Sequence, residues 1–359
     1  MRRPAASVLA LLLAVGLVGC LQEATAVDPW VGDGNVTAPD TVGEDTPDQG
    51  QADAPPPTGW TSVDLQLDPG ESVVDWIGFT VGDVRTLFWL TDWGRFGRIQ
   101  PGQPAEQLHL YASQTPQAFR ALWTADGKSF WVVGKGNTVW KGKPGLPSEL
   151  SLNDEMAADW AGVWGNGTSV IWLTGELGAY LRLDADGKNP QRFQGGTTWF
   201  SPTGDDKYAW FLSDVRIMRV TNGTDFTDKP AKGVLQLANV KDDLVAKRLY
   251  AVDPEHVYLV GAPYQLLRGQ VDASPAFGAP IFSGINPFYD VHGVPGGHRL
   301  VCGVKGELHE LNADDAELDP PADTTGLPKA EDLKRVWIFD DGSAYVLSAI
   351  SGIFYRAPQ

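Results

Sequence analysis

The chain has 359 residues, a formal net charge of -17 and only two cysteines. This acidic balance argues against nucleic-acid binding, because phosphate repulsion would have to be overcome locally and basic stripes are missing. The fourteen tryptophans are many for a chain of this size and need either a structural or a binding explanation.

Residues 1–19 are predicted to be a secretory signal. A short basic start at Arg2 and Arg3 precedes an apolar run that is too short for an ordinary membrane-spanning helix. The run ends in LVGC, which resembles the lipobox of bacterial lipoproteins. In that family the signal is cut before the cysteine, which is then acylated, so the resemblance implies that Cys20 carries a lipid anchor. The alternative is an ordinary signal with a chance cysteine.

Residues 20–59 are predicted to be a disordered acidic tether. They contain eight Asp or Glu residues, no Lys or Arg, and frequent Pro, Gly and Thr. Such a segment cannot bury enough apolar surface to offset its ordering entropy. A docking tail for a basic partner is the alternative. Leu21 follows the cysteine where an Asp is absent, which resembles the outer-membrane address of enteric lipoproteins. We therefore expect a lipid-anchored protein of the bacterial cell envelope, on either face of the outer membrane.

Residues 60–359 are predicted to form one repetitive all-β domain. Seven copies of a similar stretch recur at intervals of 38 to 48 residues, each marked by a large apolar residue in its second hydrophobic run. We call these the landmark residues: Trp89, Trp131, Trp172, Trp210, Tyr258, Leu300 and Tyr345.

Each copy has the same internal order. A first apolar run ends in a turn containing Asp, Gly, Asn or Pro, and the second run is almost entirely hydrophobic, as expected for a strand covered on both faces. A third run alternates apolar and polar residues, and a weaker fourth run often follows. Four short antiparallel strands per repeat are typical of a β-propeller blade, in which the tryptophans pack between blades.

The ends of the repeat region predict how the ring closes. The seventh copy stops after its third run, whereas Thr61–Asp68 form an alternating run before the first copy. This N-terminal strand can supply the missing edge of the last blade, so a seven-bladed propeller leaves no open sheet edge.

The turn around Thr124, Asp126, Gly127 and Trp131 resembles the Asp box of sialidase-type propellers, and the repeats also resemble the photosystem-assembly propellers of bacteria and plastids. The resemblance covers nearly all of residues 60–359. An Asp box is structural, because its carboxylate satisfies turn amides on the rim away from the functional face. The resemblance implies a propeller and leaves the function open.

Enzymatic alternatives are only weakly supported. A sialidase-like site requires three convergent arginines and a Tyr–Glu pair. Four arginines recur at one blade position, which indicates a structural role: Arg182, Arg219, Arg268 and Arg356. A quinone-dependent dehydrogenase is a weaker alternative. Since His292 and His309 are expected in adjacent strands of one blade, we interpret them as a structural pair, and we predict no metal, no cofactor and no catalytic residue. Cys302 lies in an apolar run and is predicted to be buried.

The variable turns between second and third strands are the best candidates for a ligand face, together with the connections between blades. The first of these turns carries an aromatic–Arg–aromatic cluster, and exposed Trp and Arg are frequent binding residues. The candidates are Trp93, Arg95, Phe96, Tyr264 and Lys305. Ordinary loop packing is the alternative. We expect a monomeric, lipid-anchored binding or scaffold propeller for a protein, glycan or other envelope partner, with a sialidase-like carbohydrate hydrolase as the alternative.

Overall fold

The computed structural model describes residues 59–111, 118–150, 152, 157–213, 216–222, 234–236, 245–253, 256–262, 265–269, 277–283, 286–316 and 322–358. The predicted signal peptide, Cys20 and the tether up to residue 58 lie outside these ranges, as does Tyr264. Within the described ranges no helix has the length and apolar character needed to cross a membrane.

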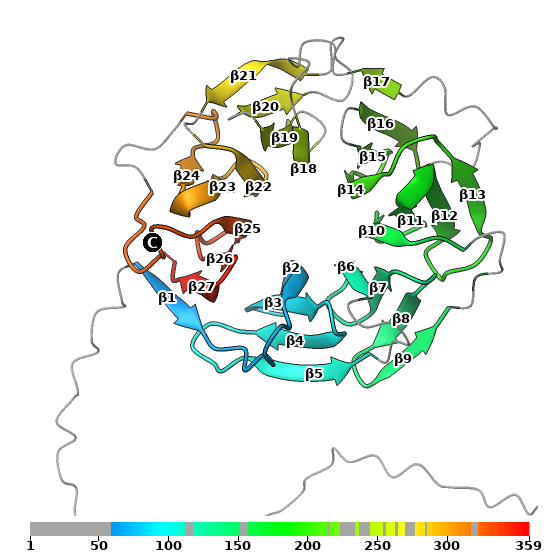
Figure 1. Ribbon diagram of the computed structural model, residues 1–359, viewed down its shortest axis with the longest axis horizontal. Coiled ribbons are helices and arrows are strands. Elements are labelled where there is room, and N and C mark those ends of the chain that lie inside the picture. Colours follow the sequence, from blue (N-terminus) through cyan, green and yellow to red (C-terminus); the bar gives the residue numbers. More distant parts are fainter. Residues whose placement is uncertain are drawn as a thin grey trace, which may run out of the picture. The chain divides into compact units, whose positions relative to one another are not determined.

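The described chain is all-β and forms seven separate antiparallel sheets arranged as the blades of a propeller (Figure 1). Blade 1 contains β2 (Val73–Val81), β3 (Val84–Thr91), β4 (Arg95–Ile99) and β5 (Glu106–Leu110). Blade 2 contains β6 (Phe119–Thr124), β7 (Phe130–Gly134), β8 (Val139–Lys143) and β9 (Leu146–Glu149). Blade 3 contains β10 (Trp160–Gly165), β11 (Val170–Gly175), β12 (Ala179–Asp184) and β13 (Gln191–Gln194), with the short η1 (Glu176–Gly178) between β11 and β12.

The remaining blades follow the same order. Blade 4 contains β14 (Phe200–Gly204), β15 (Tyr208–Leu212), β16 (Arg216–Thr221) and β17 (Val234–Gln236). Blade 5 contains β18 (Val245–Asp253), β19 (His256–Ala262), β20 (Gln265–Gly269) and β21 (Phe277–Ser283). Blade 6 contains β22 (Phe288–Gly293), β23 (Arg299–Gly303) and β24 (Leu308–Leu311), with η3 (Val304–Gly306) between the last two. Blade 7 contains β25 (Leu333–Ile338), β26 (Ala344–Ser348) and β27 (Gly352–Arg356).

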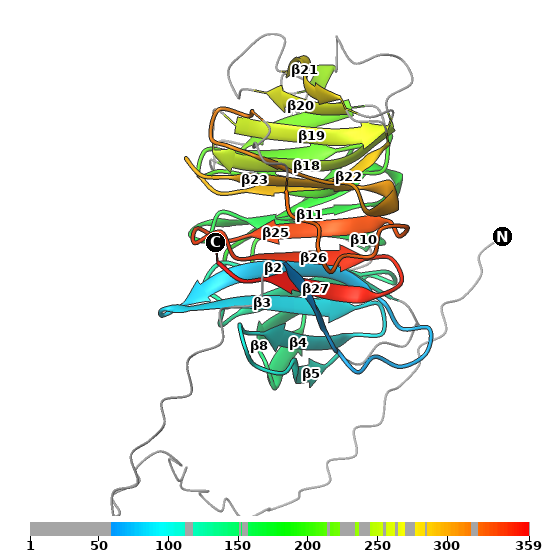
Figure 2. The same ribbon diagram turned by 90° about the vertical axis from the view of Figure 1, so that its left-hand side faces the viewer.

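The N-terminal strand closes the ring, as the sequence predicted. β1 (Trp60–Val63) pairs antiparallel with β27, from Trp60 opposite Arg356 to Val63 opposite Ile353, and so becomes the fourth strand of blade 7. The strand ends at Val63, earlier than the predicted Asp68. Figure 2 shows that the strands run from one face of the ring to the other. We name these faces by their turns: the upper face carries the second-to-third-strand turns and the connections between blades, and the lower face carries the first-to-second-strand turns.

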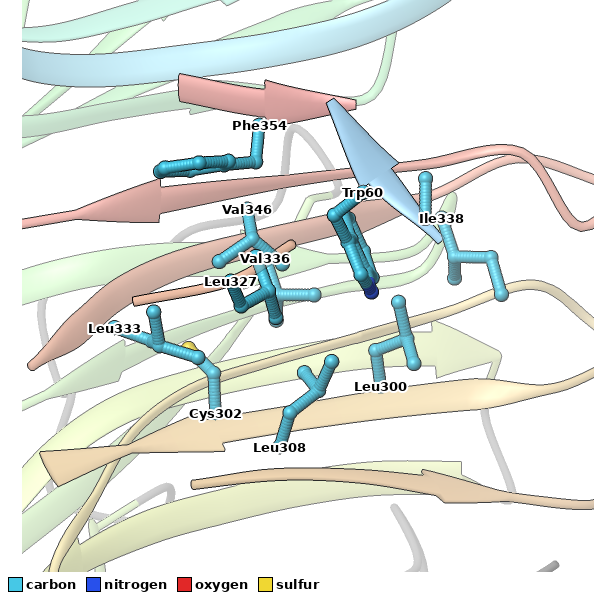
Figure 3. Close-up of a cluster of buried hydrophobic side chains, with 11 residues drawn as sticks. Trp60, Leu300, Cys302, Leu308, Leu327, Leu333, Val336, Ile338, Val346 and Phe354 are labelled. Atoms are coloured by element: carbon cyan, nitrogen blue, oxygen red, sulfur yellow. The ribbon is translucent and has the colours of Figure 1, made fainter. Parts of the chain in front are cut away.

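The core consists of one hydrophobic cluster at each of the seven seams between neighbouring blades. All residues of the second strands β7, β11, β23 and β26 are buried, which confirms that large side chains of these strands pack between blades. Figure 3 shows the cluster at the seam of blades 6 and 7, where the buried thiol of Cys302 lies among aliphatic side chains, as predicted.

One landmark residue is wrong by one position. In blades 2 to 7 the landmark side chain packs toward the following blade. In blade 1 Phe88 does so, with its ring centroid 4.7 Å from that of Phe130 in blade 2, whereas Trp89 packs toward blade 7. Because successive side chains of a strand point to opposite faces, a shift of one residue exchanges the two seams. The equivalent of Trp131 is therefore Phe88.

Candidate functional site

The walls of the central channel are the first strands of the blades, and each has a free edge whose backbone groups need partners. Side chains of one blade supply them to the next. An oxygen of Asp75 accepts a hydrogen bond from the Leu122 amide at 2.9 Å, and Asp290 accepts one from the Val336 amide at 3.0 Å. The Ser201 hydroxyl accepts the Leu249 amide at 3.2 Å in the same way. Polar side chains thus connect the first strands of neighbouring blades by hydrogen bonds.

Two ion pairs, each between a buried carboxylate and a partly buried arginine, belong to this wall. A guanidinium nitrogen of Arg335 lies 2.6 Å from Asp75, and the Nε of Arg248 lies 3.2 Å from Asp290. All four residues directly follow the β-bulge of their first strand, at equivalent positions of blades 7, 1, 5 and 6. Because burial removes water from these charges, each charged side chain needs its partner. Removing one residue of a pair would leave the other charge uncompensated.

Aromatic side chains form the next layer of the channel and follow a rule of pairing with glycine. Trp123, Trp164 and Trp337 each lie against a glycine in the first strand of the following blade, where an added Cβ would collide with the indole ring. The three glycines are Gly165, Gly204 and Gly78. In blade 5 the Tyr250 hydroxyl donates to the Gly293 carbonyl of blade 6 at 3.3 Å.

The remaining seams confirm the rule from the other side. Where the residue equivalent to Trp123 is Ile77, Thr203 or His292, the facing residue of the following blade is not a glycine. It is Thr124, Ala251 or Ile338, respectively. The channel wall is therefore fitted seam by seam, and a cavity of about 220 Å³ remains between Trp123, Trp164, Tyr250, Trp337 and their neighbours.

His292 is held neutral inside this wall. Its Nδ1 accepts the Ile338 amide hydrogen at 3.2 Å, and its Nε2 lies 2.8 Å from the Tyr250 oxygen. Since the Tyr250 hydroxyl donates to Gly293, Nε2 carries the hydrogen and donates to Tyr250. Burial, and then the positive charge of Arg248, lowers the pKa of His292 to about 3. His309, the other half of the predicted pair, lies two strands away and contacts Glu307 at 3.0 Å, so the two histidines do not form a pair.

Three arginines line the channel cavity, which is the number that a sialidase-like site requires, but each is paired with a carboxylate of the protein. Besides the two ion pairs of the wall, Arg120 lies 2.6 Å from Glu176. Tyr250 contacts His292 rather than a glutamate. In the described part of the chain, no group of three or more His, Cys, Asp or Glu side chains is placed to hold a metal ion.

The recurring basic position lies elsewhere and was assigned one residue wrongly in the last blade. Arg182, Arg219 and Arg268 pair with the landmark residues of their blades, and Arg98 and Lys141 occupy the same position. In blade 7 that position holds Tyr355. Arg356 points to the opposite side and contacts Glu310 of blade 6 at 2.6 Å.

The predicted binding residues of the first upper turn separate in space. Trp93 is 42% exposed, and the guanidinium of Arg95 bridges Asp68 at 2.6 Å and Glu71 at 3.0 Å. Phe96 is completely buried, because the alternation of β4 turns its ring into the seam of blades 1 and 2, where it packs on Phe130. The predicted exposed cluster therefore has one exposed ring instead of two.

Lys305 is exposed on the upper face, and its backbone amide donates to Asp332 at 3.2 Å. Asp332 also accepts from Lys334 at 2.8 Å and from the Tyr289 hydroxyl at 3.2 Å. Hydrogen bonds from Lys334, together with those of its other partners, keep the pKa of Asp332 below its usual range. Lys305 thus sits at the end of a polar network that fixes the upper rim of blades 6 and 7.

The sequence did not reveal a cavity that opens near this face. It has a volume of about 610 Å³ and lies at the closing seam, between the connection that follows β1 and the β26–β27 turn. Its apolar lining includes Leu65, Leu67, Val73 and Leu347, and the 81% exposed Ile350 stands at its edge. The only sequence signal was the alternation of Thr61–Asp68, which was interpreted as strand and in fact supplies one wall.

On the lower face the Asp-box-like turn is structural, as predicted. One oxygen of Asp126 accepts the amides of Lys128 at 2.8 Å and Ser129 at 2.7 Å, and the Thr124 hydroxyl donates to the Ser129 carbonyl at 2.7 Å. These backbone hydrogen bonds lower the pKa of Asp126 and overcome the opposing effect of burial. The carboxylate therefore shapes the turn.

Comparisons with known proteins agree on the fold. No family model matches the sequence, and no curated protein matches it. Among solved structures, YCF48 bound to D1 peptide is similar with a TM-score of 0.62 and 12% identity, over 80% of this chain and 92% of that chain. The extracellular domain of a hybrid two-component system of B. thetaiotaomicron, BT3049, has a TM-score of 0.64 and 9% identity, over 84% of this chain and 42% of that chain. BBS1N in complex with ARL6DN has a TM-score of 0.59 and 11% identity, over 80% of this chain and 95% of that chain.

Proposed function

We propose that this chain is a lipid-anchored, extracytoplasmic propeller that binds a protein partner of the cell envelope through its upper face. The observation that carries the proposal is the cavity of about 610 Å³ at the closing seam, which combines an apolar floor with an exposed apolar side chain, Ile350, at its edge. Concave apolar sites with a few polar groups are the usual form of binding sites in proteins.

The comparisons support this class of function without identifying the partner. Two of the similar propellers were solved with a polypeptide partner, one with D1 peptide and one with ARL6DN. A third is an extracellular bacterial domain, in keeping with an envelope location. Because one fold serves unrelated functions, these cases are analogies.

The proposed lipid anchor is Cys20, in the part of the chain that precedes the propeller. Lipidation of Cys20 is tested by labelling producing cells with an alkyne fatty acid: we expect label on the full chain and none on Cys20→Ser. Equal labelling of both would contradict the anchor.

The binding proposal is tested with two variants that are matched in exposure. Ile350 at the upper cavity and Leu146 at the start of β9 on the lower face are both 81% exposed, so Asp at either position should leave the fold intact. The tagged full chain is used to capture proteins from solubilised envelope. We expect Ile350→Asp to lose at least tenfold of a protein that Leu146→Asp and the native chain retain.

Three results would contradict the proposal. The native chain could retrieve no protein, both variants could retain it equally, or the full chain could cleave a sialoside with the partner absent. The last result would favour the hydrolase, whose best support is the presence of three arginines around the channel cavity.

A further inference from the structure

The tips of the turns differ in chemistry between the two faces. The described tips of the first-to-second-strand turns on the lower face carry small and polar residues, at 82–83, 125–129, 167–169, 206–207, 295–297 and 340–342, and the exposed Leu146 lies on this face at the start of β9. Three of the five described upper-face turns instead present a large exposed apolar side chain. These are Trp93 in blade 1, Leu177 in blade 3 and Ile350 in blade 7, with exposures of 42%, 82% and 81%.

Leu177 is also held in an unfavourable backbone conformation. It has φ 54° and ψ 25°, and Gly178 follows with φ 81°, so the pair forms a tight two-residue turn with two left-handed residues. Glycine and asparagine suit the first position of such a turn, whereas a branched side chain there is strained. The strain is enforced by neighbours, since the Gly195 amide donates to the Gly178 carbonyl at 2.7 Å and the Glu176 amide to Asp159 at 2.9 Å.

The equivalent turn of blade 6 is a natural comparison. Lys305 has φ 56° and ψ 35° and is also followed by glycine, so its backbone is strained in the same way. The exposed side chain of Lys305, however, is charged and therefore well solvated by water. Leu177 combines the strain with an exposed apolar side chain, and neither contributes to the stability of the isolated propeller. Strain at an exposed residue is a recognised sign of a functional contact.

The charges beside these tips indicate what kind of partner fits. Glu176, next to Leu177, is neutralised by Arg120 at 2.6 Å, and Arg95, next to Trp93, is neutralised by Asp68 and Glu71. The charges next to Leu177 and Trp93 are therefore already paired, and beside Ile350 the Glu331 carboxylate accepts hydrogen bonds from Ser348 and Ser351. A partner with an apolar, nearly neutral contact surface matches this rim better than a cationic one.

We propose that Leu177 is a contact residue of the upper face, and that it docks with Trp93 and Ile350 on the apolar, nearly neutral surface of a protein partner. The inference rests on the proposed function and names the part of the face that carries it. Binding is then expected to depend little on salt, because paired rim charges contribute little net attraction.

The strain is tested by Leu177→Asn, with Lys305→Asn as the matched control. Since Asn tolerates the left-handed region, each variant of the full chain should melt about 2 °C higher than the native chain. Lys305→Asn is the control for the melting temperature alone; in capture of the partner, Leu177→Asn should lose at least tenfold, whereas Leu146→Asp on the lower face should lose nothing. A lower melting temperature for Leu177→Asn, or unchanged capture, would overturn the proposal.

The contact itself is tested by placing a photoreactive benzoyl-phenylalanine at position 177 of the full chain in the cells that produce it, with Asp206 on the lower face as the control position. A protein adduct at 177 that is missing at 206 supports the proposal. An adduct with a second copy of this chain, a lipid adduct, or no adduct would each overturn it. If capture succeeds while crosslinking at 177 fails, the binding function stands and only the role of Leu177 falls.

Discussion

The indole ring of Trp337 in blade 7 lies against the α-carbon of Gly78 in blade 1, so that no side chain fits at position 78. On its other side the ring stacks on His292, with centroids 3.7 Å apart. Trp337 is thus clamped between blades 6 and 1, at the seam that joins the two ends of the repeat.

Gly78→Ala is expected to destabilise the propeller by about 2 kcal/mol, because a clamped indole cannot yield to an added methyl group. Urea unfolding measures the change. In the double variant with Trp337→Leu the alanine should cost much less, giving a coupling of about 1 kcal/mol or more. If the two effects simply add, the packing argument is wrong.

His292 should make stability depend on pH. Its folded pKa of about 3 lies far below the ordinary value of 6.5, so protonation favours the unfolded chain. The stabilisation is complete above about pH 6.5 and is lost as the pH falls toward 3, by about 2 kcal/mol between pH 7 and pH 5. Unfolding free energies of the native chain and His292→Gln at both pH values measure this contribution.

Carboxylates with lowered pKa, such as Glu310 beside Arg356, also lose stabilisation in acid, but at lower pH than the histidine. The variant should therefore be clearly less sensitive than the native chain between pH 7 and pH 5. Equal sensitivity would mean that His292 is accessible to protons in the folded state.

Asp75→Asn is expected to cost about 3 kcal/mol, because it leaves the Arg335 charge in the wall without a counterion. Replacing both residues, as Asp75→Leu with Arg335→Met, should recover most of this loss, since the uncompensated charge is then removed. Thermal unfolding of the three variants gives the comparison. A double variant as unstable as the single one would indicate that the hydrogen bond from Leu122 to Asp75 matters more than the ion pair.

Removing residues 1–63 should destabilise the ring strongly, whereas removing residues 1–58 should not. The longer deletion takes away β1 and Trp60, which is 4% exposed and whose indole nitrogen donates to the Asp323 carbonyl at 2.7 Å. Loss of this one side chain alone costs about 3 kcal/mol or more. Calorimetry of both truncated chains checks the result, and similar melting temperatures would show that β1 does not hold the ring closed.

Much of the fold could be predicted from the sequence, because repetition and strand patterning are local properties that recur seven times. The errors arose where a shift of one residue decides on which face of its strand a side chain lies. Two adjacent aromatics, Phe88 and Trp89, both suit a buried strand. They are distinguished only through Gly78, whose pairing register and contact with blade 7 fix which of the two side chains faces the following blade. The same ambiguity led to two further errors. Arg356 was assigned to the recurring basic position, which holds Tyr355 in blade 7, and the ring of Phe96 was predicted to be exposed.

The channel wall was missed for another reason. Its pairs, such as Arg335 with Asp75 and Tyr250 with His292, join residues of different blades, and a blade-by-blade comparison does not bring them together. A usable signal was nevertheless present: glycine stands at one fixed position of the first strand wherever the preceding blade supplies Trp or Tyr, at Gly78, Gly165, Gly204 and Gly293. Binding roles of Trp93, Arg95, Tyr264 and Lys305 remain predictions.

The pairing of β1 with β27 also sets the order of events during synthesis. β1 is made before every blade, and its partner is made after all of them, so the first strand must wait unpaired for the last. Contacts between such distant segments slow folding, because a long loop has to close before they form. An incomplete chain displays open strand edges throughout this wait, so this protein is most prone to misassociation just before its last strand appears.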